Sequence, residues 1–392
     1  MKSCILKYSD VFIRRLVLFL VIFQSCGIRL FTGIGFLLSI LVMFILFARI
    51  KLSNTELLKL FLLFCGVVTF FYIKGENALF IANILFIVLN ATLLCKLYED
   101  GSCFSSDFRV ILFVIAWHAF LSAILDFILP SAVLQKTDNI ICSETFLYVF
   151  YFTDTDLFIP GFTRLTGMMW EPGCLQLFLN LLLTLLIFEK RKTKTYWWVA
   201  LLVVLTGSTS GYIILLVNVV FYLYINRNWK VLLAGTAISV LFLPLAYGKI
   251  FEKMEVGANS SATIRYRDFY IGIRNVLEYP FSGINVSDLE ENAKVLKWEE
   301  DAIYLILGKY TWFDYFEPLA GGYTNGFMFV FMMWGVFGWL FYYSFIKCKL
   351  WKFCMKNYFI VIPLVFFLSM TSEPISNTSL FYFLSLYNYM NQ

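Results

Sequence analysis

The sequence predicts an all-α membrane protein, a polytopic transmembrane helical bundle of about twelve spans. Of its 392 residues, 60% are hydrophobic and only 15% are charged, whereas charged residues make up about a quarter of an ordinary soluble protein. The apolar residues gather in runs of helix length and not in the short alternating segments of barrel strands. This composition excludes a soluble enzyme, a disordered protein, a nucleic-acid-binding protein and a β-barrel.

The apolar runs place the predicted spans in order along the chain, several of them shorter than the ~20 residues needed to cross a bilayer. They cover residues 10–27, 31–48, 57–73, 77–95, 110–129, 172–188, 195–207, 210–226, 230–248, 325–346, 357–370 and 375–389. Two long connections, residues 130–171 and 249–324, interrupt a series of otherwise short loops. We therefore expect one integral membrane domain over residues 1–392, with two long loops on one face.

The distribution of basic residues predicts the orientation in the membrane. Most of the 31 Lys and Arg residues, including the clusters Lys190–Lys194 and Lys347–Lys356, fall at one set of span ends. Because short cytoplasmic loops are enriched in Lys and Arg, we expect both termini inside the cell and both long loops outside. In a bacterium with two membranes, the long loops then face the periplasm from the inner membrane.

The first long loop ends in Gly161–Gly173, which contains Arg164 and the dipeptide Glu171-Pro172 immediately before a predicted span. Pro172 suits the first turn of a helix, so Glu171 is expected at that helix's N-terminus, where a carboxylate is favoured. Two interpretations follow for Glu171, a helix cap or a reacting carboxylate. Glu373-Pro374, before the last predicted span, repeats the same dipeptide.

The second long loop contains a basic amphipathic segment, Ser260–Asn285. Ser260 or Ser261 is a suitable cap for a helix that ends before Pro280. On that helix, Arg267 and Arg274 share a face and Arg265 points roughly the other way. The segment is typical of a helix that lies on a membrane surface and equally of an arginine site for a diphosphate.

These segments together resemble the O-antigen polymerase (Wzy) family of the O-antigen polymerase and ligase superfamily. The R-x-x-G-x-x-x-[NE]-P pattern is similar to Arg164, Gly167, Glu171 and Pro172, and a Ser/Thr-Gly break between two half-length spans is similar to Thr206–Tyr212. The pattern of the large loop is similar to Arg265, Phe269, Gly272, Pro280 and Gly283. Two departures are Asn285, where a second Gly is common, and Tyr323–Gly326, which lacks the His of the ligase branch and so favours a polymerase.

The resemblance implies a GT-C-like fold and glycosyl transfer at the periplasmic face. Undecaprenyl diphosphate carries the growing glycan, which is transferred to a repeat unit on the same lipid. Arg164 and Arg265 are the expected cations for the leaving diphosphate, and Glu171 is the expected base. We also expect Arg267, Arg274, Tyr212, Asn325 and Glu373 to bind the substrate.

Partners and alternatives follow from the same resemblance. We expect undecaprenyl-diphosphate-linked glycans and membrane lipid as partners, together with a chain-length regulator and a flippase of the same pathway in lipopolysaccharide biosynthesis. No cofactor and no metal is expected. An O-antigen ligase is the nearest alternative, and a lipid-linked oligosaccharide flippase or other transporter is the alternative from another class. His118, in the middle of a predicted span, is interpreted either as functional or as a neutral side chain hydrogen-bonded within the bundle.

Overall fold

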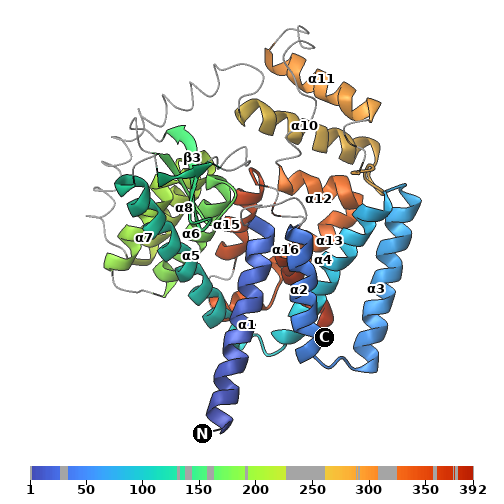
Figure 1. The fold of residues 1–392 in the computed structure, drawn as a ribbon. Helices are drawn as coiled ribbons and strands as arrows, with labels where there is room; N and C mark the ends of the chain where they lie inside the picture. The colour runs from blue at the N-terminus through green and yellow to red at the C-terminus, as the bar shows by residue number, and fades with distance from the viewer. Residues whose placement is uncertain are drawn as a thin grey trace.

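The computed structural model is a mainly helical protein with one small sheet (Figure 1). Its description covers residues 2–26, 34–129, 133–136, 144–156, 163–189, 193–226, 261–287, 289, 292–307, 325–355, 360–373, 375 and 378–391. Within these ranges, the helices follow the apolar runs of the sequence closely. The predicted span 230–248 lies outside the described residues.

The N-terminal part of the chain forms five helices, which begin and end where local signals require. They are α1 (Lys2–Cys26), α2 (Ile34–Arg49), α3 (Asn54–Ile73), α4 (Ala78–Leu97) and α5 (Ser102–Ile128). Ser53 caps α3 in a reciprocal arrangement with Glu56, and the Asn77 side chain accepts a hydrogen bond from Phe80 N at the start of α4. Such caps satisfy N–H groups that have no partner within the helix.

The first long loop contains a four-stranded antiparallel sheet, which the sequence did not predict. The strands pair in chain order and are β1 (Gln135–Lys136), β2 (Glu144–Phe146), β3 (Phe150–Asp156) and β4 (Thr163–Gly167). The last strand packs against α5, where a Cβ added at Gly167 would lie 3.4 Å from Ala119. The expectation of an all-α chain thus holds for the bundle and not for this loop.

Three helices follow the sheet, namely α6 (Pro172–Phe188), α7 (Thr193–Leu205) and α8 (Thr209–Asn226). Helix α6 is buried along almost its whole length. Its polar residues Asn180 and Thr184 hydrogen-bond to Asn218 of α8, at 3.2 and 2.7 Å. Buried amide and hydroxyl contacts of this kind hold neighbouring helices together in a membrane.

The second long loop contributes α10 (Ser261–Glu278) and α11 (Ala293–Leu307), which lie across one end of the bundle (Figure 1). The predicted helix that begins at Ser260 or Ser261 and ends before Pro280 is confirmed by α10. Arg267 of α10 forms buried ion pairs with Asp268 and with Glu299 of α11, at 2.9 Å each. The pair with Glu299 joins the two helices.

The C-terminal part consists of α12 (Gly326–Trp334), the 3-10 turn η2 (Gly335–Phe337), α13 (Gly338–Ile346), α14 (Leu350–Cys354), α15 (Val361–Met370) and α16 (Ser379–Met390). The predicted span 325–346 is therefore interrupted. Gly335 at the break has φ +56°, and a Cβ there would lie 2.6 Å from the backbone of Phe281. The segment that follows α10 thus packs directly on the break, which only a glycine permits.

Several helices are long and apolar enough to cross a membrane, so the chain is a membrane protein. In the described part of the chain, this holds by length and composition for α3, α4, α5 and the interrupted stretch Gly326–Cys354. Shorter apolar helices include α6, α8 and α15. The number of crossings, twelve, and the side on which the long loops lie remain predictions.

Candidate active site

The candidate site centres on Arg164, which lies on β4. Its Nε donates a hydrogen bond to Thr206 O at 3.2 Å, in the turn between α7 and α8. That turn is the Thr206–Tyr212 break, where α7 ends at Leu205 and α8 begins at Thr209. Arg164 therefore connects the sheet to this helix break.

Four other predicted residues lie close enough to Arg164 for their charges to act on it. Burial lowers the pKa of the Arg164 guanidinium. That lowering is opposed by Glu171, Tyr212 and Glu373 and is increased by the positive charge of Arg265. These five side chains come from β4, the start of α6, α8, the turn between α15 and α16, and α10. Segments far apart in the sequence thus converge on one place.

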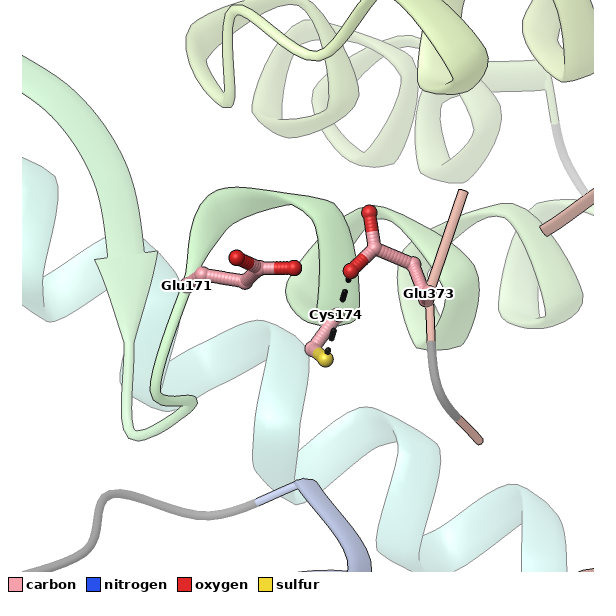
Figure 2. A group of neighbouring side chains, drawn as sticks. All are labelled: Glu171, Cys174 and Glu373. Atoms are coloured by element: carbon pink, nitrogen blue, oxygen red, sulfur yellow. Dashed lines mark hydrogen bonds between the residues drawn. The ribbon is translucent and has the colours of Figure 1, made fainter. Parts of the chain in front are cut away.

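Glu171 and Glu373 face each other at the first turn of α6 (Figure 2). Their carboxylate oxygens and the Cys174 sulfur all lie within 4.8 Å of one another. Cys174 Sγ donates a hydrogen bond to Glu373 Oε2 at 3.8 Å. The two carboxylates and the two arginines nearby have formal charges that sum to zero.

Glu171 occupies the N-cap position of α6, with Pro172 in the first turn, as the sequence predicts. Its backbone carbonyl accepts from Cys174 N and Leu175 N at 3.2 and 3.3 Å. Its side chain, however, makes no capping hydrogen bond. Among the described residues, the carboxylate of Glu171 is therefore not engaged as a helix cap.

Glu373 is buried, with 1% of its surface exposed. Its carboxylate lies directly over Gly173, where an added Cβ would be 1.8 Å from Oε1. A glycine at this position lets the carboxylate approach the helix N-terminus, whose free N–H groups favour an anion. Gly173 and Cys174 are contributions to the site that the sequence interpretation missed, although both directly follow Glu171-Pro172.

Arg265 is half-buried in the first turns of α10. It makes no hydrogen bond or ion pair with any residue that the structure describes. Its guanidinium is close enough to Arg164 for the two positive charges to repel each other. Two guanidinium groups that repel each other across a site are a suitable arrangement for an anion with two charges.

The structure gives three of the predicted substrate-binding residues other surroundings. Arg267 is buried in its ion pairs with Asp268 and Glu299. Arg274 pairs with Glu278 at 3.3 Å on the last turns of α10. Asn325 caps α12, where its Oδ1 accepts from Met328 N at 3.0 Å, and its own N–H donates to Asp268 Oδ2 at 3.3 Å. We therefore interpret Arg267 and Asn325 as structural residues.

Tyr212 lies near Arg164, and its hydroxyl donates to Val204 O at 2.9 Å.

Within the described ranges, one group of side chains has donor atoms close enough together to hold a metal ion, namely Glu171, Cys174 and Glu373. Carboxylate and thiolate are ligands that Zn²⁺ accepts, so a reaction without a metal remains a prediction.

No family model, curated protein or solved structure matches this chain.

Proposed function

We propose that the protein is a polysaccharide polymerase of O-antigen or capsule type, which transfers a growing glycan from undecaprenyl diphosphate to a lipid-linked repeat unit. The observation that carries the proposal is the convergence of Arg164, Arg265, Glu171 and Glu373 from separate elements. Cations and carboxylates at one site supply the two functions that this transfer needs. The resemblance of the same segments to the Wzy family supports the assignment.

The reaction assigns a role to each charge. A hydroxyl of the acceptor sugar attacks the anomeric carbon of the donor glycan, and the bond from that carbon to the diphosphate oxygen breaks. The electron pair leaves with undecaprenyl diphosphate, whose developing charge Arg164 and Arg265 stabilise. Glu171 takes the proton of the attacking hydroxyl.

Glu373 supports the reaction from beside Glu171. Its negative charge lies against the N-terminus of α6 and near Arg164. In this position its charge favours the cationic form of Arg164. The site is proposed to open to the periplasm from the inner membrane.

The test is the surface glycan of a strain that lacks the protein, complemented with variants. A polymerase deletion leaves core with one repeat unit attached and no long chains. Arg164→Ala and Arg265→Ala should give the same pattern with normal amounts of protein in the membrane, and Lys should restore it only partly because it lacks the planar fork. Lys297→Ala, an exposed residue of α11, is the control.

Other patterns contradict the proposal and identify the alternatives. Bare core with lipid-linked polymer accumulating indicates a ligase. Lipid-linked repeat units trapped on the cytoplasmic side indicate a flippase. Long chains of normal length in either alanine variant would remove that arginine from the mechanism.

A further inference from the structure

The connection between β2 and β3 has an unusual sequence for its backbone. Leu147 and Tyr148 have φ values of +56° and +53°, in the left-handed region. Turns whose two central residues both have positive φ usually take Asn-Gly or Asp-Gly at those positions. Here the side chains of Leu147, Tyr148 and Val149 are apolar and are 64%, 57% and 49% exposed. We call Leu147–Val149 the hairpin tip.

The position of the hairpin tip along α5 follows from two contacts. Near the end of α5, Thr163 Oγ1 donates to Asp126 Oδ2 at 2.7 Å. At the tip, the His118 ring hydrogen-bonds through Nε2 to Val149 O at 3.0 Å and stacks on Phe150 at 4.8 Å. His118 precedes Asp126 by eight residues, or about 12 Å of helix.

The tip therefore lies beside the apolar part of α5. Residues 110–125 contain no Asp, Glu, Lys or Arg, and α5 is long and apolar enough to cross a membrane. Val114, Trp117 and Leu121 of the same stretch are 48%, 54% and 47% exposed. Exposed apolar side chains at this depth of a membrane-crossing helix contact lipid, and the tip lies at the same level.

Three backbone groups of the tip, Tyr148 O, Val149 N and Val149 O, have hydrogen-bond partners, which suits a lipid environment. Val149 N donates to Phe146 O at 3.2 Å, and Tyr151 Oη donates to Tyr148 O at 3.0 Å. The His118 ring hydrogen-bonds to Val149 O, and Thr145 Oγ1 donates to Phe150 O at 2.9 Å. In hydrocarbon, an unpaired carbonyl costs several kcal/mol, whereas water would satisfy it on an ordinary surface turn.

Charged residues of the sheet lie on the side away from the tip. Glu144 of β2 is opposite Lys136 of β1. Glu144 precedes Leu147 by three residues, which is about 10 Å of strand. This pair is suited to the headgroup level when the tip is in the acyl chains.

We propose that the hairpin tip inserts into the acyl-chain region of the leaflet around the Ile128 end of α5. The occupant of this surface is bilayer lipid, because the tip continues the exposed apolar face of a membrane-crossing helix. His118 and Tyr151 favour the insertion by hydrogen-bonding to Val149 O and Tyr148 O. The inference concerns lipid contact and is independent of the reaction proposed above.

The test measures the surroundings of a nitroxide attached at the tip. A cysteine replaces Tyr148, or Leu147 as a second position, in the full-length protein with its native cysteines replaced, reconstituted in lipid nanodiscs. Collision of the nitroxide with oxygen, which partitions into lipid, is compared with collision with a water-soluble nickel chelate. Leu121→Cys of α5 is the lipid control, and Lys297→Cys, at an exposed position of α11, is the aqueous control.

The proposal expects the labels at Tyr148 and Leu147 to behave as the label at Leu121 does, with frequent oxygen and rare chelate collisions. Chelate collisions as frequent as at Lys297 would overturn it, because the tip would then lie in water. Low collision with both reagents would also overturn it, because the tip would then be covered by protein. Each variant is accepted for measurement only if its melting profile matches that of the unlabelled protein.

Discussion

At the scale of single residues, Glu171 separates two interpretations of the same position. It occupies the N-cap of α6, but its side chain makes no capping hydrogen bond. Ser53 provides the contrast. Its side chain accepts a hydrogen bond from Glu56 N, and the Glu56 carboxylate accepts one from Ser53 N. The Glu171 carboxylate faces Glu373 instead (Figure 2), which favours a role in chemistry over a role in helix stability.

We predict that Glu171→Gln lowers the rate of glycan transfer by on the order of 10²-fold or more, because it removes the proposed general base. Binding of undecaprenyl diphosphate and the melting temperature should stay near those of the wild type. The measurements are turnover with purified lipid-linked repeat units and thermal unfolding.

Ser53→Ala is the matched control for Glu171→Gln. It removes a true cap and should cost about 1 kcal/mol of stability without loss of transfer. If the Glu171→Gln variant turned over within a few-fold of the wild type, Glu171 would be excluded as the base and the search would move to Glu373.

At the residue scale, short sequence patterns predict which side chains lie together better than they predict ion-pair partners that are distant in the sequence; the roles of these residues in the reaction remain predictions. Arg164 and Glu171 were found from short patterns, and the structure brings both to the same place. Arg267 was assigned to substrate from its helical face. Its partner Glu299 lies on α11, 32 residues away in the sequence, and no spacing rule predicts that pairing.

At the scale of elements, Gly173 sets the distance between α6 and the turn that carries Glu373. We predict that Gly173→Ala lowers transfer strongly while the protein stays folded. The new Cβ would lie 1.8 Å from Glu373 Oε1, and the carboxylate is the flexible end of a side chain that moves at little cost to folding. Turnover and melting temperature measure the two effects.

Gly66→Ala is the matched control for Gly173→Ala. Nothing lies within 4 Å of a Cβ added at Gly66 in α3, so neither activity nor melting temperature should fall. Equal activity of the two alanine variants would contradict a role for the Glu373 position in transfer.

The turn between α3 and α4 holds the segment that follows α10. Lys74 Nζ donates to Met333 O at 2.8 Å, and the Glu76 carboxylate accepts from Val286 N and Ser287 N at 2.7 and 2.8 Å. Burial lowers the pKa of Lys74 to about 8, against the opposing charge of Glu76. This contact links the long loop to the bundle and to the break at Gly335.

The lowered pKa of Lys74 predicts a dependence of stability on pH. The folded value lies below the ordinary value of 10.5, so between about pH 8 and pH 10.5 the unfolded chain binds this proton and the folded protein does not. Stability should therefore rise with pH in that window. Lys74→Met should lack this rise, and the difference between the two melting curves isolates Lys74 from other groups. Parallel curves for wild type and variant would contradict the assignment.

At the scale of the whole molecule, apolar runs predicted the helices well because helix length and burial depend on local sequence. Each predicted span within the described residues coincides with a helix, except that the span 325–346 is divided into two helices by the break at Gly335. The sheet was not predicted. Strands of two to seven residues carry little periodic signal, and β4 is held by its contact with α5.

The orientation of the molecule gives a labelling prediction. With both termini in the cytoplasm, a cysteine placed at Asn292 or Asp138 should react with a membrane-impermeant reagent from the periplasmic side. A cysteine placed at Lys192 or Lys352 should react only after the membrane is opened. Labelling at position Lys192 from outside would reverse the orientation and the proposed location of the site.

The most direct test of the proposed transfer uses purified protein in lipid nanodiscs with lipid-linked repeat units extracted from the deletion strain. Chain length of the lipid-linked glycan and released undecaprenyl diphosphate are measured together. We predict that glycans of two or more repeat units appear, with one undecaprenyl diphosphate released for each new linkage, and that Arg164→Ala and Arg265→Ala abolish both signals. Unchanged repeat units and no released carrier with the folded wild-type protein would contradict the account.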